Sequence, residues 1–235
     1  MNETQLSKRL EIVGAQVPAG SRLADIGSDH AYLPIALMLA GKISHAIAGE
    51  VVQGPFQSAQ NQVAKNNLSE KIEVRLADGL EAITLADEID AITIAGMGGS
   101  LIRDILENGR QKGRLSGKEY LILQPNIGER NVREWLADHS YQIDFETVLA
   151  EKGKIYEVIA AEKSDMPVTY TEEELMFGPL LVQNPTSVFQ QKWQRELHQR
   201  EQVWTQLQTA KTPPSEKLTQ IRREIEKIRE VLQHD

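Results

Sequence analysis

The sequence predicts an α/β fold with a mostly parallel sheet, followed by an α-helical hairpin. Residues 22–40 show a short apolar strand, a glycine turn and a helix, which is the first unit of an open α/β sheet. Strand-like apolar runs and helix-like segments then alternate along the chain. From residue 163 on, apolar residues come to recur at three- and four-residue intervals, which is typical of packed helices. We therefore expect two domains, 1–162 and 163–235.

The composition limits the classes of protein that the chain can belong to. Its 235 residues suffice for one full α/β domain and a small appendage. There is no apolar run long enough for a membrane span and no signal-peptide core, so we expect a cytoplasmic protein. The absence of cysteine excludes disulfides, thiolate metal sites and a cysteine nucleophile. A net charge of −8 excludes a globally basic surface, so any RNA-binding surface must be local.

The first strand and its turn indicate the charge of a ligand. Arg22–Ile26 ends at Gly27, where the backbone leaves room for a ligand to approach closely. A dinucleotide-binding turn would carry three glycines, whereas this turn carries one and is preceded by Asp25. A carboxylate there repels a pyrophosphate and attracts a cation, which favours S-adenosylmethionine, with its cationic sulfonium, over NAD. Ser28 and Asp29 are predicted to cap the following helix.

Acidic residues also follow the second and third strands. Glu50 comes after the strand that begins at Ser44, where one carboxylate can accept hydrogen bonds from both hydroxyls of a ribose. The alternative is a helix N-terminal carboxylate favoured by the helix dipole. Asp78 follows the strand Ile72–Ala77 and is either an acceptor for the exocyclic amine of adenine or a turn aspartate. The fourth strand, Ile89–Ala95, is unbroken and mostly apolar, as in a central parallel strand.

A glycine-rich segment, Gly96–Ser100 (GMGGS), follows the fourth strand. Three glycines in four positions allow an aromatic base to lie against the backbone with little steric hindrance. The alternative is a flexible loop before a helix that starts near Leu101 and is capped by Ser100. The basic side chains that follow are either a solvated face or a surface that positions phosphates beside this segment: Arg103, Arg110, Lys112, Arg114 and Lys118.

The fifth strand begins at Glu119 and closes with the motif LQPN, which ends at Asn126. In the helix predicted over 128–139, Arg130 and Arg133 are three residues apart and share a face. From that face they either reach RNA phosphate or pair with neighbouring glutamates.

The last two strands, Tyr141–Ala150 and Lys154–Ala161, are predicted to form an antiparallel hairpin at the edge of the sheet. They bring the predicted sheet to seven strands. A helix is also predicted over Thr4–Val13, from the spacing of its apolar residues.

The C-terminal domain is predicted to be an antiparallel coiled-coil hairpin. Thr171 and Glu174 have the spacing of a capping box. A long helix then carries an aromatic stripe, and Pro213–Pro214 turns the chain into a second helix with a heptad seam. The stripe and the seam consist of Phe189, Trp193, Leu197, Arg200, Trp204 and Leu207, and of Leu218, Ile221, Ile225, Ile228 and Leu232.

Three motifs, DIGSDHAYLP from Asp25, AGMGGS from Ala95 and LQPN, together resemble those of a known family. The chain is similar to the bacterial tRNA adenine-N1 methyltransferases that modify position 22 of tRNA, over its whole length. The resemblance implies a Rossmann-like class I methyltransferase fold and methyl transfer from S-adenosylmethionine to N1 of that adenine. Because N1 has a lone pair and no proton to lose, no general base is required. Because N1 lies on the Watson–Crick edge, the base must be exposed or flipped.

The resemblance also implies roles for individual residues. Those expected beside the reacting atoms are Gly96, Met97, Asn126 and Tyr32. Those expected to bind S-adenosylmethionine are Asp25, Gly27, Asp29, His30, Glu50, Val51, Asp78, Gly79 and Gly96. Those expected to contact RNA are Arg9, Arg103, Arg110, Lys112, Arg114, Lys118, Arg130 and Arg133. His30 has a second, purely structural interpretation.

The expected partner is tRNA, with no membrane and no metal, and the expected state is a monomer or weak homodimer. The helical hairpin is expected to bind either tRNA or another subunit. Two other functions are open at this point. One is a class I methyltransferase acting on another RNA or on a small molecule, and the other is a noncatalytic assembly protein with a vestigial cofactor fold. The Asn/Asp-Pro-Pro-Tyr/Phe motif of enzymes that methylate exocyclic amines is absent after the fourth strand, which disfavours that reaction.

Overall fold

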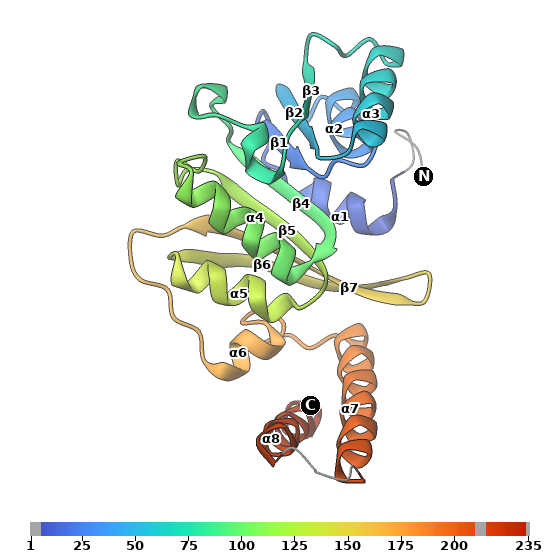
Figure 1. Ribbon diagram of the computed structural model, residues 1–235, viewed down its shortest axis with the longest axis vertical. Helices are drawn as coiled ribbons and strands as arrows, with labels where there is room; N and C mark the ends of the chain where they lie inside the picture. Colours follow the sequence, from blue (N-terminus) through green and yellow to red (C-terminus); the bar gives the residue numbers. More distant parts are fainter. Residues whose placement is uncertain (1–5, 210–214, 234–235) are drawn as a thin grey trace.

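The computed structural model describes residues 6–209 and 215–233, and it shows a seven-stranded sheet with helices on both faces (Figure 1). The strand order is β3-β2-β1-β4-β5-β7-β6, and only β7 runs antiparallel to its neighbours. This confirms the predicted fold class and the antiparallel hairpin at the edge. The strands are β1 (Arg22–Ile26), β2 (His45–Glu50), β3 (Ile72–Leu76), β4 (Ala91–Gly98), β5 (Tyr120–Ile127), β6 (Tyr141–Glu151) and β7 (Lys154–Lys163).

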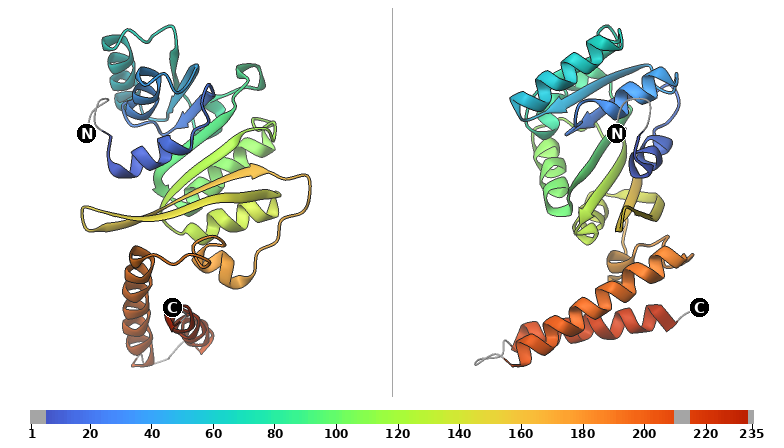
Figure 2. Two further views of the ribbon diagram at one scale, coloured as in Figure 1. Left: turned by 180° about the vertical axis from the view of Figure 1, so that it is seen from behind. Right: turned by 90° about the vertical axis from the view of Figure 1, so that its right-hand side faces the viewer.

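The helices divide between the two faces of the sheet and the C-terminal hairpin. One face is covered by α1, α2 and α3, and the other by α4, α5 and a 3-10 turn, η1. The right-hand view of Figure 2 shows α1 and α2 on the side of the sheet opposite to α4 and α5. The helices are α1 (Lys8–Gln16), α2 (Tyr32–Leu39), α3 (Gln53–Lys65), η1 (Gly79–Ala82), η2 (Leu85–Asp87), α4 (Gly99–Gln111), α5 (Glu129–Asp138), α6 (Glu172–Phe177), α7 (Ser187–Gln208) and α8 (Ser215–Gln233).

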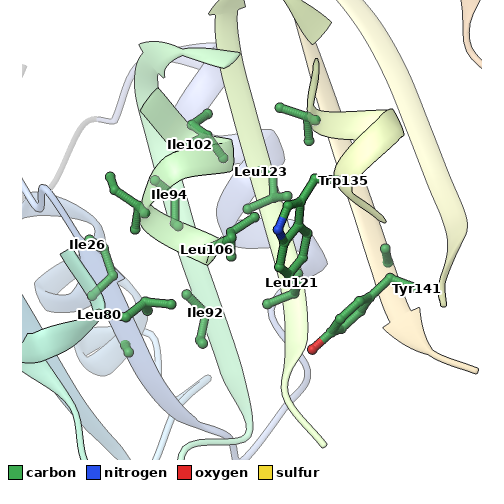
Figure 3. Close-up of a cluster of buried hydrophobic side chains, with 14 of the residues drawn as sticks. Ile26, Leu80, Ile92, Ile94, Ile102, Leu106, Leu121, Leu123, Trp135 and Tyr141 are labelled. Atoms are coloured by element: carbon green, nitrogen blue, oxygen red, sulfur yellow. The ribbon is translucent and has the colours of Figure 1, made fainter. Parts of the chain in front are cut away.

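The two-residue period of the strands divides the core between these faces. In β4, Ile92 and Ile94 pack toward α4 and α5, while Ala91 packs toward the helices of the opposite face. Figure 3 shows the first cluster, in which Leu106 of α4 and Trp135 of α5 lie over the central strands. The central strands are therefore buried on both sides, and only their ends are open to a ligand.

Several predicted helix ends differ from the structure. Ser28 does not cap α2, because its hydroxyl donates to Asp25 instead, and Ala31 precedes α2 in a left-handed conformation without a side-chain cap. Ser100 lies inside α4, which begins directly after β4. The glycine-rich segment is therefore strand and helix rather than a flexible loop. The N-terminal helix begins at Lys8, and the start predicted at Thr4 lies outside the described residues.

The C-terminal helices α7 and α8 pack side by side below the sheet in Figure 1. The predicted capping box of Thr171 and Glu174 is confirmed at the start of α6. The hairpin shares a hydrophobic cluster with the α/β domain, in which Trp193 of α7 and Ile228 of α8 pack with Val148 of β6. The predicted turn at Pro213–Pro214 lies outside the described residues.

Two kinds of feature are absent from the described ranges. Within residues 6–209 and 215–233, no helix has the length and apolar character needed to cross a membrane. The same residues contain no group of three or more His, Asp or Glu side chains placed to hold a metal ion.

Candidate functional site

The carboxyl ends of four neighbouring strands meet at one edge of the sheet. Parallel pairing places Ile26 of β1 opposite Gly49 of β2 and Ile94 of β4. The backbone N–H groups of Gly27 and Ser28 both donate to the carbonyl of Gly49, at 2.9 and 3.2 Å. The residues predicted to bind a cofactor at the ends of β1, β2, β3 and β4 are thus brought to a common edge, although Gly27 and Gly96 are 69 positions apart in the chain.

The turn after β1 is conformationally strained. Asp29, His30 and Ala31 have φ angles of 43°, 68° and 58°, in the left-handed region that costs about 1–2 kcal/mol for each residue with a side chain. Three such residues in succession persist only where the surroundings hold them. The surroundings include a short hydrogen bond between His30 Nδ1 and Ser58 Oγ, and stacking of the His30 ring on Tyr32 at 5.3 Å. Strain of this kind clusters at ligand sites.

Asp25 lies beneath this turn rather than in the open site. Its carboxylate is 4% exposed and accepts hydrogen bonds from Thr93 Oγ1 at 2.6 Å and Ser28 Oγ at 2.5 Å. Burial raises the pKa of Asp25, although both hydroxyls act in the opposite direction. The carboxylate therefore ties the turn to β4 and contributes negative charge just below the edge.

Glu50 is a buried carboxylate with an unused acceptor. It is 6% exposed, and its Oε1 has no hydrogen-bond partner among the described residues. Burial is the main cause that raises the pKa of Glu50, and the backbone N–H of Asp29 counteracts it. An unsatisfied buried acceptor costs free energy, which a ligand that donates a hydrogen bond would recover. Adjacent hydroxyls, such as those of a ribose, are suitable donors.

Exposed apolar side chains lie next to Glu50. Val51 and Leu76 are exposed, at the ends of β2 and β3. Asp78 is also exposed, directly before Gly79, which has a φ of 53°. An apolar surface beside a carboxylate is suited to a purine ring with an exocyclic amine. The predicted adenosine-binding residues are thus placed side by side.

The backbone of Gly96 is held from both sides by polar side chains. Gln124, which is fully buried, accepts from the N–H of Gly96 at 3.0 Å. Asn126 Nδ2 donates to the carbonyl of Gly96 at 2.7 Å. Arg9 donates to the same Gln124 oxygen and lies over the ring of Tyr156 at 5.4 Å. We call Arg9, Gln124 and Asn126 the Gly96 clamp.

The side chain of Met97, near the end of β4, lies close to Gly27 in the turn after β1. Gly27 has a φ of 70°, in the left-handed region that favours glycine, and a Cβ atom there would lie 2.1 Å from the mobile methyl group of Met97. Gly99 is constrained by the backbone, because its Cβ would lie 2.0 Å from the carbonyl oxygen of Gly128. A left-handed turn therefore explains Gly27, and close backbone packing explains Gly99.

The predicted RNA-binding residues are only partly at this edge. The prediction for Arg133 is wrong, because its guanidinium is fully buried and paired with Glu146 and Glu157. Arg114 and Lys118 were expected beside the glycine segment, but they line a hollow with residues that directly precede β4 and β5. They therefore lie at the opposite edge, since α4 runs antiparallel to β4.

The other predicted RNA contacts are already engaged with the protein. Three of them have a carboxylate partner close in space, in the pairs Arg103–Asp104, Arg110–Glu107 and Lys112–Glu81. Arg130 is exposed and pairs with Glu134 and Glu172. Arg9 belongs to the Gly96 clamp. These residues form no cluster of unpaired cations.

We call the edge at the carboxyl ends of the parallel strands the active edge. Sequence reasoning missed a groove between this active edge and the helical hairpin. The groove measures about 690 Å³ and extends from Asn126 and Ile127 at the end of β5 to α7. Lys154 and Arg195 line it, and neither has a carboxylate partner among the described residues. These two cations are 41 positions apart in sequence, so no local charge run indicates them. The missed Gln124 did leave a signal, as the polar end of an apolar strand.

Comparisons with known proteins agree on one family. A family profile described as TrmK, tRNA (adenine(22)-N(1))-methyltransferase, matches residues 23–230. The chain is 47% identical over 240 residues to the tRNA (adenine(22)-N(1))-methyltransferase of Bacillus subtilis strain 168, with 100% of both chains covered.

Two solved structures of relatives contain the cofactor or its product. Streptococcus pneumoniae Sp1610, in complex with S-adenosyl-L-methionine, has a TM-score of 0.88 and 46% identity, covering 97% of this chain and 100% of that one. M. capricolum TrmK, in complex with S-adenosyl-homocysteine, has a TM-score of 0.83 and 31% identity, with 97% of each chain covered. Together with the matching profile and the B. subtilis relative, these structures show that the chain belongs to the tRNA (adenine(22)-N(1))-methyltransferase family.

Proposed function

We propose that this chain methylates N1 of adenine 22 in tRNA through the edge at the carboxyl ends of the parallel strands β1, β2, β3, β4 and β5. Family membership confirms the predicted reaction class and the predicted cofactor, S-adenosylmethionine. The observation that carries the assignment of the site is the buried Glu50 Oε1, which has no partner within the described residues. It lies on the same edge as the clamped Gly96. The predicted cytoplasmic location and oligomeric state stay predictions.

The residues around Glu50 fit the cofactor. When bound, S-adenosylmethionine supplies a methyl group on a cationic sulfonium. Glu50 accepts from the ribose hydroxyls, and Asp78 accepts from the adenine amine, while Val51 packs on the ring. Asp25 and the turn at Gly27 supply negative charge and close backbone approach at the amino-acid portion. Negative charge here favours a ligand that carries positive charge and no phosphate.

The Gly96 clamp positions the target adenine, which accepts the methyl group. The NH₂ group of Asn126 donates to the Gly96 carbonyl, and its Oδ1 accepts a long hydrogen bond from Gln124 Nε2 at 3.4 Å. The second lone pair of Oδ1 is left to accept from the target base. The exocyclic amine of adenine is a donor next to N1, and Asn126 Oδ1 would hold it so that N1 faces the cofactor side. Guanine presents a carbonyl oxygen at that position and would leave two acceptors facing each other. Arg9 and Gln124 act as positioning residues. Catalysis is then mainly orientation of donor and acceptor.

The groove beside the hairpin gives domain 163–235 a role in holding tRNA. Lys154 and Arg195 are placed along it to neutralise phosphates, and the groove begins at Asn126. Lys154→Ala and Arg195→Ala should each raise KM for tRNA and lower the salt dependence of binding by about one unit of slope. Lys152→Ala is the matched control, because Lys152 is exposed in the same β-hairpin but does not line the groove.

The test of the proposed function is position mapping in tRNA. The protein is incubated with isotopically labelled S-adenosylmethionine and with tRNA carrying either adenine or guanine at position 22. Mass spectrometry should find one methyl group, on N1 of adenine 22, and none in the guanine variant. Methylation of another nucleotide, or of small molecules in a metabolite extract, would contradict the proposal. Absence of cofactor binding would favour a noncatalytic protein.

A further inference from the structure

Large exposed apolar side chains concentrate at the active edge. Of the nine in the described part of the chain, five lie at the carboxyl ends of strands or directly after them: Val51, Val52, Leu76, Leu101 and Ile127. The first three surround the adenosine-binding residues, which accounts for them. Leu101 and Ile127 instead flank the glycine segment, on the acceptor side. No contact with the described residues buries either of them.

Ile127 is the more prominent of the two. It is 73% exposed, the highest value among these nine side chains, and it ends β5 next to Asn126. Its partner in the sheet is Gly98 of β4, so Ile127 lies beside the glycine segment. The backbone there is rigid, because α4 packs directly on the carbonyl groups of Ile127 and Gly128.

The charges around Ile127 indicate what covers it. Ile127 lines the groove that also contains Lys154 and Arg195, two cations of the groove without a carboxylate partner among the described residues. The glutamates of the groove, Glu129, Glu196 and Glu224, are each paired with Lys192 or Arg200. A rigid apolar side chain beside such cations is suited to RNA, with bases on the isoleucine and phosphates on the cations. The proposed reaction also requires that the target adenine leave its stack, which opens a gap between its neighbours.

We propose that Ile127 is a wedge that packs against the bases next to the extruded adenine, with Leu101 supporting the same contact. The proposal rests on the proposed function and adds how the target base is exposed. Apolar wedges stabilise unstacked steps in nucleic acids because they replace the lost stacking contacts. The partner is the RNA substrate itself, and Ile127 acts on the base step rather than on the methyl transfer.

The experiment compares Ile127→Ser and Ile127→Leu on two substrates. One is intact tRNA, and the other is the same tRNA with an abasic nucleotide next to the target adenine, which removes a stacking neighbour. Ile127→Ser should lower kcat/KM about 10- to 100-fold on intact tRNA, since a few kcal/mol of unstacking is no longer offset. On the abasic tRNA the loss should shrink to about threefold or less, and Ile127→Leu should retain most activity on both.

A matched control and a second measurement separate the wedge from a structural role. Leu85→Ser changes an aliphatic residue of similar exposure in η2, which contacts the first residue of β1 at the opposite edge. It should leave both substrates unaffected. With 2-aminopurine at the target position, saturating wild-type protein should raise the fluorescence, and Ile127→Ser should raise it less.

Three outcomes would overturn the wedge. They are equal losses on both tRNAs, unchanged kinetics of Ile127→Ser on intact tRNA, and a shift from dimer to monomer in Ile127→Ser by sedimentation. The last would show that a second copy of the chain covers the side chain. Failure of the proposed function is distinguishable, because then the wild-type protein itself would not methylate adenine 22.

Discussion

Two regions of this protein bury a pair of carboxylates, and they do so in opposite ways. At the joint between the sheet and the helical hairpin, the side chains of Glu146 and Glu157 are buried with that of Arg133, and the partly exposed Lys192 also pairs with Glu157. At the active edge, Asp25 and Glu50 are buried without any cation paired to them in the described residues. A buried carboxylate that is paired with a cation can stabilise the fold. A buried carboxylate without a cation is instead suited to bind a ligand that carries positive charge or donates hydrogen bonds.

The joint is a network of ion pairs in which only Arg133 Nη1 has no hydrogen-bond partner among the described residues. Arg133 of α5 donates to Glu146 at 2.8 Å and to Glu157 at 2.5 Å, and Lys192 of α7 donates to Glu157 at 2.7 Å and Glu129 at 2.6 Å. Burial by itself would raise the pKa of Glu157, but Lys192 and Arg133 outweigh it and lower that pKa. The same carboxylates raise the pKa of Lys192 against the effect of burial.

The active edge has hydroxyl and backbone donors in place of cations. Burial raises the pKa of Asp25 and that of Glu50, and the charges of Asp25 and Asp29 raise the pKa of Glu50 further. Folding thus concentrates negative charge at a place where it is not neutralised by the protein. Such a site is complementary to a ligand with a positive centre and hydroxyl donors.

The largest expected effect is at the joint. Arg133→Met leaves two glutamates buried with Lys192 alone, and loss of one partner of a buried pair typically costs about 3–5 kcal/mol. The free energy of unfolding, measured by urea denaturation, should fall by that amount. Where the variant is still folded, its affinity for S-adenosylmethionine should match the wild type. A loss below about 1 kcal/mol would mean that the joint is no more than a surface ion pair.

At the active edge, the equivalent change should affect binding and spare stability. Glu50→Gln keeps the shape but removes the charge and one acceptor, which is worth about 1.5–3 kcal/mol in a charged hydrogen bond. The Kd for S-adenosylmethionine, measured by calorimetry, should therefore rise about 10- to 100-fold. The free energy of unfolding without ligand should not fall. Glu88→Gln, at an exposed glutamate remote from this edge, is the control. An equal rise of Kd in Glu88→Gln would mean that the loss of affinity is not specific to Glu50.

The comparison also shows which features sequence can reveal. Glu50 and Asp78 can be predicted as candidate ligand-binding residues because the end of a parallel strand is a defined place, and strands are recognisable from their apolar runs. Arg133 was misassigned because helical spacing shows which residues share a face but not whether the face meets solvent or protein. Its partners, Glu146 and Glu157, lie 13 and 24 positions further along the chain. The clamp and the groove depend on equally distant residues, Arg9 with Gln124 and Lys154 with Arg195.

The smallest expected effect is a proton released on cofactor binding. In the ligand-free protein, burial holds the pKa of Glu50 above its usual 4.5. Hydroxyl donors and a nearby cation favour the ionised carboxylate, so binding lowers that pKa. At a pH between the two values, part of the free protein carries a proton that binding must release. Affinity should therefore rise with pH through this window and level off above the pKa of the free protein.

Calorimetry in two buffers with different ionisation enthalpies, at a pH just above 4.5, measures the release directly. A fraction of a proton should be released for each cofactor bound, and Glu50→Gln should abolish the part of this release that comes from Glu50. The carboxylates of the joint are paired with Arg133 and Lys192 and not with the edge around Glu50, so they should contribute nothing to the signal. Proton uptake, or an undiminished release in Glu50→Gln, would mean that Glu50 is not the group that receives the cofactor's hydroxyls. The uncompensated charge at this edge would then need another ligand.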